Sequence, residues 1–215
     1  MSVKLIYTLF CTHSVIFPLL LAGMRYRHLP DYIKTICLWL LFSLVTEIIV
    51  SDILTFALDK QNVIYYNFYT IFEFSFLALF FYQASKIQLL KKVILVITPI
   101  FIAFCLLDMA VLEGWQVLNA FSLGISSILL MSLILVLFFE TSNDLNLTFM
   151  EQSPVFWILI GLLLYFASTF FLYIFVNKMV STDPKVADQL WDLNSYALLV
   201  RNFIFCVGIL KIPVR

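Results

Sequence analysis

Residues 32–57 read YIKTICLWLLFSLVTEIIVSDILTFA, and their charged side chains are Lys34, Glu47 and Asp52. A helix of roughly 20 apolar residues is enough to cross the hydrocarbon core of a bilayer. The stretch meets that length, yet Glu47 falls near its middle. It therefore predicts a membrane-spanning helix that carries a charge at the depth where a charge is most costly.

The rest of the chain shares this apolar character. The chain has 215 residues, of which 63% are hydrophobic and 12% are charged, and its mean hydropathy is +1.05. A soluble domain is about 45–50% apolar and about 25% charged. We therefore expect an integral membrane protein whose first partner is the lipid bilayer. The net charge of zero gives no indication of a nucleic-acid partner.

Apolar stretches of spanning length recur along the whole sequence, and only short connections separate them. The predicted spans are residues 3–23, 32–57, 63–84, 92–110, 118–140, 154–178 and 190–211. The pattern predicts an all-α membrane protein with seven transmembrane helices. Because the connections are too short to hold a soluble unit, residues 1–215 are expected to form one domain.

The distribution of Lys and Arg predicts the orientation, because cytoplasmic loops are enriched in them. With the N-terminus outside, the inner connections carry Arg25, Arg27, Lys34, Lys86, Lys91, Lys92, Lys211 and Arg215. The outer side then carries Lys4, Lys60, Lys178 and Lys185. This difference of eight against four predicts an outer N-terminus and an inner C-terminus.

Three charged residues fall near the middle of three different spans: Glu47, Glu73 and Arg201. A charge at the bilayer centre costs about 2.5–3.5 kcal/mol on insertion scales, so such residues usually face the protein interior. One arginine can satisfy two carboxylates, and we expect Arg201 to pair with Glu47 or Glu73. The group could act as a structural clamp, or it could handle a ligand, an ion or a proton.

Other polar side chains lie in the halves of the spans that would be outermost. The candidates for a ligand, ion or proton site are Glu47, Glu73, Arg201, His13, Asp52, Asn67, Tyr69 and Asn194. Their distribution predicts a polar cavity that opens outward and ends at the charged layer. His13 is either a packed polar side chain or a member of a metal or proton site. With two histidines in all and no CxxC spacing, we expect no metal, no cofactor and no catalytic set.

Three motifs carry a family resemblance. They are SPVFWILIGLLLYF at 153–166, Tyr66-Asn67 followed by Glu73-Phe74, and Leu190-Trp191 leading into Asn194-Ser195. Together they resemble an uncharacterised family of small bacterial seven-helix membrane proteins. The resemblance implies a multi-pass protein of the bacterial cytoplasmic (inner) membrane, and it implies no activity. Relatives in that family often carry His where this chain has Asn194, so no metal or proton role follows for that position.

Four functions remain open at this point. A receptor-like or sensory module would bind an unknown ligand in the outer cavity and signal through a protein partner in the membrane. An accessory subunit of a membrane complex would use the charges only for structure. A small proton or solute carrier would move its cargo past the carboxylates. An intramembrane enzyme acting on lipid is the fourth, and the sequence favours it least.

Overall fold

The computed structural model describes residues 10–50, 63–144, 147–182 and 184–213, and these are all helical or in short connections. The long elements are α2 (Ile16–Met24), α3 (Asp31–Thr46), α4 (Val63–Ala84), α5 (Gln88–Leu107), α6 (Ala120–Asp144), α7 (Pro154–Thr182) and α8 (Pro184–Leu210). Short elements are η1 (Tyr26–His28), the π-helical η3 (Asp108–Leu112) and η4 (Leu147–Gln152). The predicted all-α class is confirmed, and each predicted span overlaps one of these helices. Helices α2 and α3 cover only part of the predicted spans 3–23 and 32–57, of which residues 3–9 and 51–57 lie outside the described part of the chain.

Within the described residues, five helices are long and apolar enough to cross a membrane. They are Asp31–Val50, Val63–Ala84, Gln88–Leu112, Ala120–Asn143 and Asp192–Leu210. Two shorter apolar helical stretches, Phe10–Met24 and Pro154–Phe170, correspond to the first and sixth predicted spans. This composition is that of a membrane protein. The orientation of the chain across the bilayer stays a prediction.

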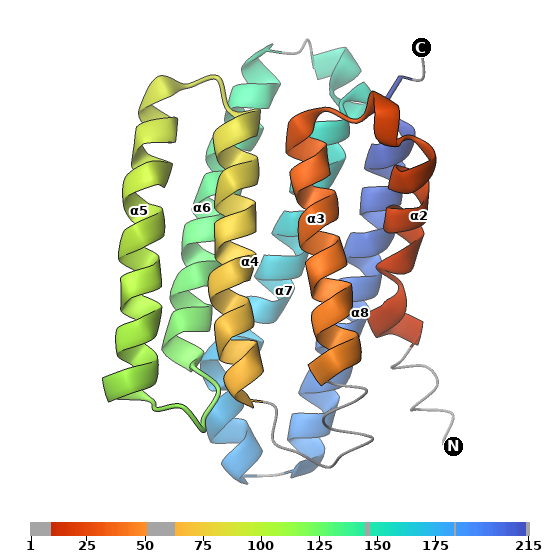
Figure 1. Ribbon diagram of the computed structural model, residues 1–215. Helices are drawn as coiled ribbons and strands as arrows, with labels where there is room; N and C mark the ends of the chain where they lie inside the picture. Colours follow the sequence, from red (N-terminus) through yellow and green to blue (C-terminus); the bar gives the residue numbers. More distant parts are fainter. Residues whose placement is uncertain (1–9, 51–62, 145–146, 183, 214–215) are drawn as a thin grey trace.

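The helices form one bundle that closes on itself through α2 (Figure 1). Helix α3 packs against α4, α4 against α6, α6 against α7, and α7 against α8. Helix α2 contacts both α8 and α3, which closes the ring, while α5 packs on its outside against α4 and α6. The first and last long helices therefore lie side by side although they are far apart in the sequence.

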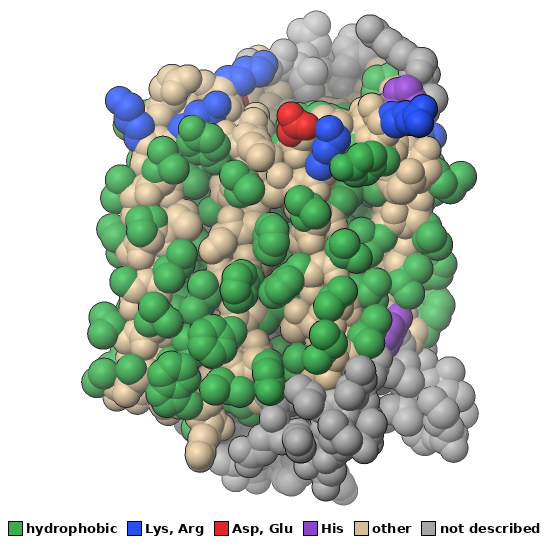
Figure 2. Space-filling view, in the orientation of Figure 1, with side chains coloured by type: hydrophobic (Ala, Val, Ile, Leu, Met, Phe, Trp, Pro, Cys, Tyr) green, Lys and Arg blue, Asp and Glu red, His purple; other side chains and the backbone are tan. Residues whose placement is uncertain are grey.

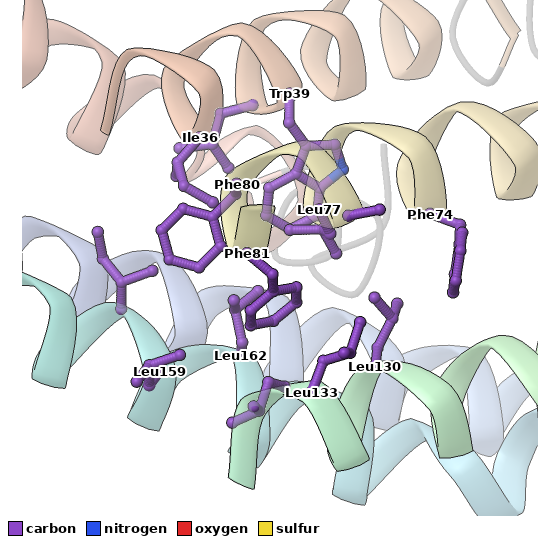
Figure 3. Close-up of a cluster of buried hydrophobic side chains, with 14 of the residues drawn as sticks. Ile36, Trp39, Phe74, Leu77, Phe80, Phe81, Leu130, Leu133, Leu159 and Leu162 are labelled. Atoms are coloured by element: carbon purple, nitrogen blue, oxygen red, sulfur yellow. The ribbon is translucent and has the colours of Figure 1, made fainter. Parts of the chain in front are cut away.

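Large aromatic and aliphatic side chains fill the interior of this bundle (Figure 3). Trp39 of α3, together with Phe74 and Phe81 of α4, is fully buried. Helices α7 and α8 can approach closely because small residues face their neighbours. A Cβ atom at Gly161 would lie 2.8 Å from Cε1 of Phe205, so glycine is required there for the close approach.

On the face shown in Figure 2 the surface is mostly hydrophobic, and Lys and Arg side chains gather at one end of the bundle. That end holds the α4–α5 connection and the C-terminus of α8, and with them most of the basic residues that the sequence assigns to the inside. Arg25 is one of them, and its Nη1 donates to the carbonyls of Ile209 (3.3 Å), Leu210 (2.9 Å) and Ile212 (3.0 Å). The last carbonyls of a helix lack partners within the helix, so Arg25 closes α8 while fixing it to α2.

Candidate functional site

One group of polar side chains lies between α3 and α4. Tyr69 Oη is 3.1 Å from Ser43 Oγ and 3.3 Å from Oε1 of Glu73. One helical turn away, Tyr66 Oη donates to Oε2 of Glu47 at 3.5 Å. The two helices run antiparallel, so residues that advance along α3 meet residues that recede along α4. This register brings together the polar faces that the two spans show in the sequence.

Glu73 is the buried end of this group, with 5% of its surface exposed. Among the described residues its hydrogen-bond partner is Tyr69. A phenol carries one proton, so when Tyr69 donates to Glu73 it accepts from Ser43. The order Ser43–Tyr69–Glu73 is therefore a chain of exchangeable protons that ends on a buried carboxyl group.

Glu47 lies where α3 changes its helical geometry. The α-helical part of the span ends at Thr46, and residues 47–50 continue as a π-helical turn. Single π turns are common at functional sites, because they redirect side chains without ending the helix. Glu47 is thus half-buried at a local irregularity, whereas Glu73 is set in a regular helix.

Arg201 of α8 occupies a cage of aromatic rings. Its Cζ lies 4.8 Å from the ring centre of Trp39 on α3, 4.7 Å from that of Tyr165 on α7 and 5.8 Å from that of Phe205 on α8. Only 1% of the residue is exposed. Cation–π contacts of this kind strengthen when the cation is desolvated, to about 2 kcal/mol or more. The rings therefore compensate part of the cost of burying the guanidinium group.

The hydrogen-bond partner of Arg201 is a neutral amide. Nε and Nη2 of Arg201 donate to Oδ1 of Asn202 at 3.2 and 3.0 Å. Asn202 in turn donates through Nδ2 to Ser14 Oγ at 2.8 Å, and Ser14 donates to the carbonyl of Cys11 at 2.6 Å. This chain of contacts fixes Arg201 to the segment before α2, and Nη1 of Arg201 has no hydrogen-bond partner among the described residues.

The expected pairing of Arg201 with a carboxylate is therefore wrong for the described part of the chain. Arg201 and Glu73 are close enough to interact electrostatically, but no ion pair joins Arg201 to Glu73 or Glu47 within the described residues. The physical reason is the lateral order of the helices: α4 and α8 lie on opposite sides of the ring, and the guanidinium group is surrounded by aromatic rings of α3, α7 and α8.

The other predicted site residues are spread along the bundle. Asn67 binds the α5–α6 connection, donating to the carbonyl of Val117 (2.9 Å) and accepting from the amide of Asn119 (3.0 Å). His13 is half-buried directly before Ser14, and Asn194 is half-buried on α8 about two turns before Arg201. Asp52 lies outside the described residues. The structure thus places Tyr69 in contact with Glu73, and it places Glu47 between the same two helices, α3 and α4. Asn67 contacts the α5–α6 connection instead.

A second buried carboxylate lies at the start of α6. Asp108, in the π-helical η3, accepts from both the amide (3.1 Å) and the hydroxyl (2.5 Å) of Ser122 through Oδ2. These bonds satisfy donors in the first turn of α6 that have no partner within the helix. The other oxygen, Oδ1, has no partner among the described residues. We interpret Asp108 as a cap that joins α5 to α6.

Sequence reasoning missed Trp39, Asn202 and Ser14 as members of the site. A signal was present for two of them, since Trp39 lies in the middle of a span and not at its end, and Asn202 makes a second polar residue beside Arg201. Within the described residues, no three His, Cys, Asp or Glu side chains come together as a group that could hold a metal ion. The site thus has a hydroxyl and carboxyl chain on one side and buried N–H donors on the other.

Comparison with known proteins gives no family or relative. No protein-family model, no curated protein and no solved structure matches the chain. The resemblance to small bacterial seven-helix proteins therefore stays a prediction, and a function has to be argued from the site itself.

Proposed function

We propose that the chain is a receptor-like module of the membrane that recognises a small ligand between Glu73 and Arg201. The observation that carries the proposal is the separation of these two opposite charges. Both are buried, they lie on α4 and α8, and within the described residues each bonds to a neutral group on its own helix and not to the other. A purely structural clamp would be expected to close, because an unpaired buried charge is costly.

Held apart, the two charges influence the distance between α4 and α8 across the bundle. A ligand that inserts between them, or that binds one of them, changes this influence and so shifts the population of two packings of the bundle. Because the connections are short, the signal would pass to a protein partner within the membrane. In this proposal the N-terminus faces outward, the basic end faces the cytoplasm, and the membrane is the bacterial inner membrane.

The hydroxyl chain Ser43–Tyr69–Glu73 favours one other function, that of a small proton-coupled carrier. The chain can pass a proton to or from the buried carboxyl group. A carrier and a receptor differ in their transport activity. Proton or solute flux in liposomes that contain the purified protein supports the carrier and contradicts the receptor.

The distance between α4 and α8 can be measured directly. Spin labels at Leu79 on α4 and Phe203 on α8, both exposed on the apolar surface, report their separation by double electron–electron resonance. The measurement requires a background in which the four cysteines are replaced. We expect two distance populations, and we expect Glu73→Gln to change their ratio because it removes one of the two charges.

The exposed Glu151 supplies the matched control. Glu151→Gln also removes a carboxylate, but from a residue that lies away from Glu73 and Arg201. It should leave the distance distribution unchanged. A single narrow distribution that is the same in all three proteins would overturn the receptor-like proposal. It would favour the accessory subunit, in which the buried charges only stabilise the bundle.

A further inference from the structure

We infer that the Arg201 cage is a binding site for a carboxylate, which Nη1 of Arg201 and Nε1 of Trp39 would hold. The inference rests on the proposed function and gives its ligand a chemical class. The donor atoms belong to two side chains that are almost completely buried, on α8 and α3. Neither atom has a hydrogen-bond partner among the described residues.

The two donors belong to neighbouring side chains, since the guanidinium group of Arg201 lies against the face of the Trp39 ring. The guanidinium carbon lies 4.8 Å from the ring centre of Trp39, and the Trp39 and Phe205 rings lie 6.3 Å apart in an edge-on arrangement. A buried donor that lacks an acceptor costs about 1–3 kcal/mol, and more when it is charged. Two such donors in contact make an acceptor group the missing component of the site.

The pattern of used and unused atoms on Arg201 specifies the shape of that group. A guanidinium group has five N–H donors in a planar fork. Asn202 takes the edge formed by Nε and Nη2, which leaves the second N–H bond of Nη2 and both N–H bonds of Nη1, so the edge between Nη1 and Nη2 is open. A planar group with two oxygens matches the open edge, as in the paired contacts that arginine makes with carboxylates.

The charge of the surroundings selects a carboxylate over a phosphate. A phosphate brings up to two negative charges and needs more donors than the cage leaves open. A buried site disfavours a dianion more than a monoanion, because the cost of removing a group from water rises with its charge. A single negative charge would neutralise the guanidinium group, whose present hydrogen-bond partner is a neutral amide.

The carboxylate could belong to a small soluble acid or to the head of a fatty acid, and the two sources reach the cage by different routes. A soluble acid enters through the outer end of the bundle, and a fatty acid enters between helices from the bilayer. The probes for the test are acetate and benzoate, then laurate, each compared with its neutral amide. Inorganic phosphate and chloride serve as the other anions.

Trp39→Phe is the decisive variant, because it removes Nε1–H and keeps an aromatic ring beside Arg201. Its matched control is Trp157→Phe, which removes an indole donor that binds the Glu151 carbonyl at the surface (2.8 Å). Binding is followed as the rise in melting temperature of the purified protein in nanodiscs with increasing concentration of each probe. Melts in probe-free buffer correct for any change in stability.

We expect at least one carboxylate to raise the melting temperature, while its amide has no effect. Trp39→Phe should weaken that carboxylate by about tenfold or more, as expected for the loss of a hydrogen bond to a charged group. Trp157→Phe should leave it unchanged. Arg201→Gln, if it folds, should abolish the effect.

Three results would overturn the inference: a stabilisation by the amides equal to that by the acids, a response to phosphate or chloride alone, or a carboxylate effect that Trp39→Phe leaves intact. The absence of any response would overturn it as well. None of these results touches the distance measurement between α4 and α8, so the ligand class can fail while the receptor-like proposal stands. The reverse also holds, since carboxylate binding without a change in helix packing would leave the cage as a binding site only.

Discussion

The two sides of the charged layer satisfy their polar groups in opposite ways. On the α3–α4 side, Glu73 is bonded to a hydroxyl group that its own helix supplies one turn away. On the α8 side, Arg201 contacts rings from three helices and an amide from its own helix, and Nη1 remains without a partner among the described residues. Local sequence spacing produces the first arrangement, whereas only the assembled bundle produces the second.

The comparison indicates that the carboxylate side is locally self-sufficient and that the Arg201 side depends on tertiary packing. Changes to the cage should therefore affect stability more than changes to the hydroxyl chain. Unfolding in mixed detergent micelles gives the free energies that test this ranking.

Trp39→Ala should have the largest effect. The side chain is fully buried against Arg201 and Phe205, and removing a buried Trp costs about 3–5 kcal/mol. Trp115→Ala is the control, since Trp115 is 44% exposed. This variant should lower the free energy of unfolding much less. Equal losses for the two variants would mean that the cage contributes nothing beyond ordinary aromatic packing.

Tyr69→Phe should come next and tests the carboxylate side. It removes the hydroxyl group that contacts both Ser43 and Glu73, and leaving a buried polar group without its partner costs about 1–3 kcal/mol. Tyr65→Phe, at a residue that is 47% exposed, should be nearly neutral. A loss as large as that of Trp39→Ala would contradict the ranking of the two sides.

The sequence predicts this carboxylate side well and the Arg201 side poorly, for a physical reason. Helical spacing places Tyr69 and Glu73 on one face, and a short connection makes α3 and α4 antiparallel neighbours. The position of Arg201 near the middle of its span predicts that it lies at the same depth as Glu73. Depth gives no information on lateral order, however, so it could not reveal that Trp39 and Tyr165 lie beside Arg201.

The same limitation explains the contact between the first and last parts of the chain. Ser14 and Asn202 are each ordinary polar residues in an apolar span, and their hydrogen bond exists because α2 closes the ring against α8. Periodicity within either span predicts which residues share a face. It does not predict which of the other helices that face meets.

Gly161→Ala should have a smaller effect than Trp39→Ala, and it tests whether the position of the Phe205 ring in the cage matters for stability. The added Cβ would meet the Phe205 ring at 2.8 Å, and it would displace a wall of the cage. Overpacking of this kind typically costs about 1–3 kcal/mol. Gly23→Ala is the matched control in α2, where nothing lies within 4 Å of the added atom, and it should gain up to about 1 kcal/mol from helix propensity.

For Gly161→Ala, the ligand experiment gives a second measurement. A displaced Phe205 ring shifts the guanidinium group, so the carboxylate response should weaken together with stability. If Gly161→Ala is as well tolerated as Gly23→Ala, then α7 and α8 do not pack as closely as the structure requires.

Arg25→Gln should have the smallest effect, and it contrasts the two arginines. Arg25 donates to three carbonyls at the end of α8 and lies near the surface, whereas the buried Arg201 retains an unpartnered Nη1 among the described residues. Cations at a helix C-terminus contribute about 0.3–1 kcal/mol when they are exposed to solvent, so a loss in that range is expected. Arg27→Gln removes the same charge from the exposed η1 turn and should cost less, because within the described residues the bonds to α8 come from Arg25. An equal loss from both variants would assign the effect to net charge at the basic end, and it would remove Arg25 as the link that holds α2 and α8 together beside the cage.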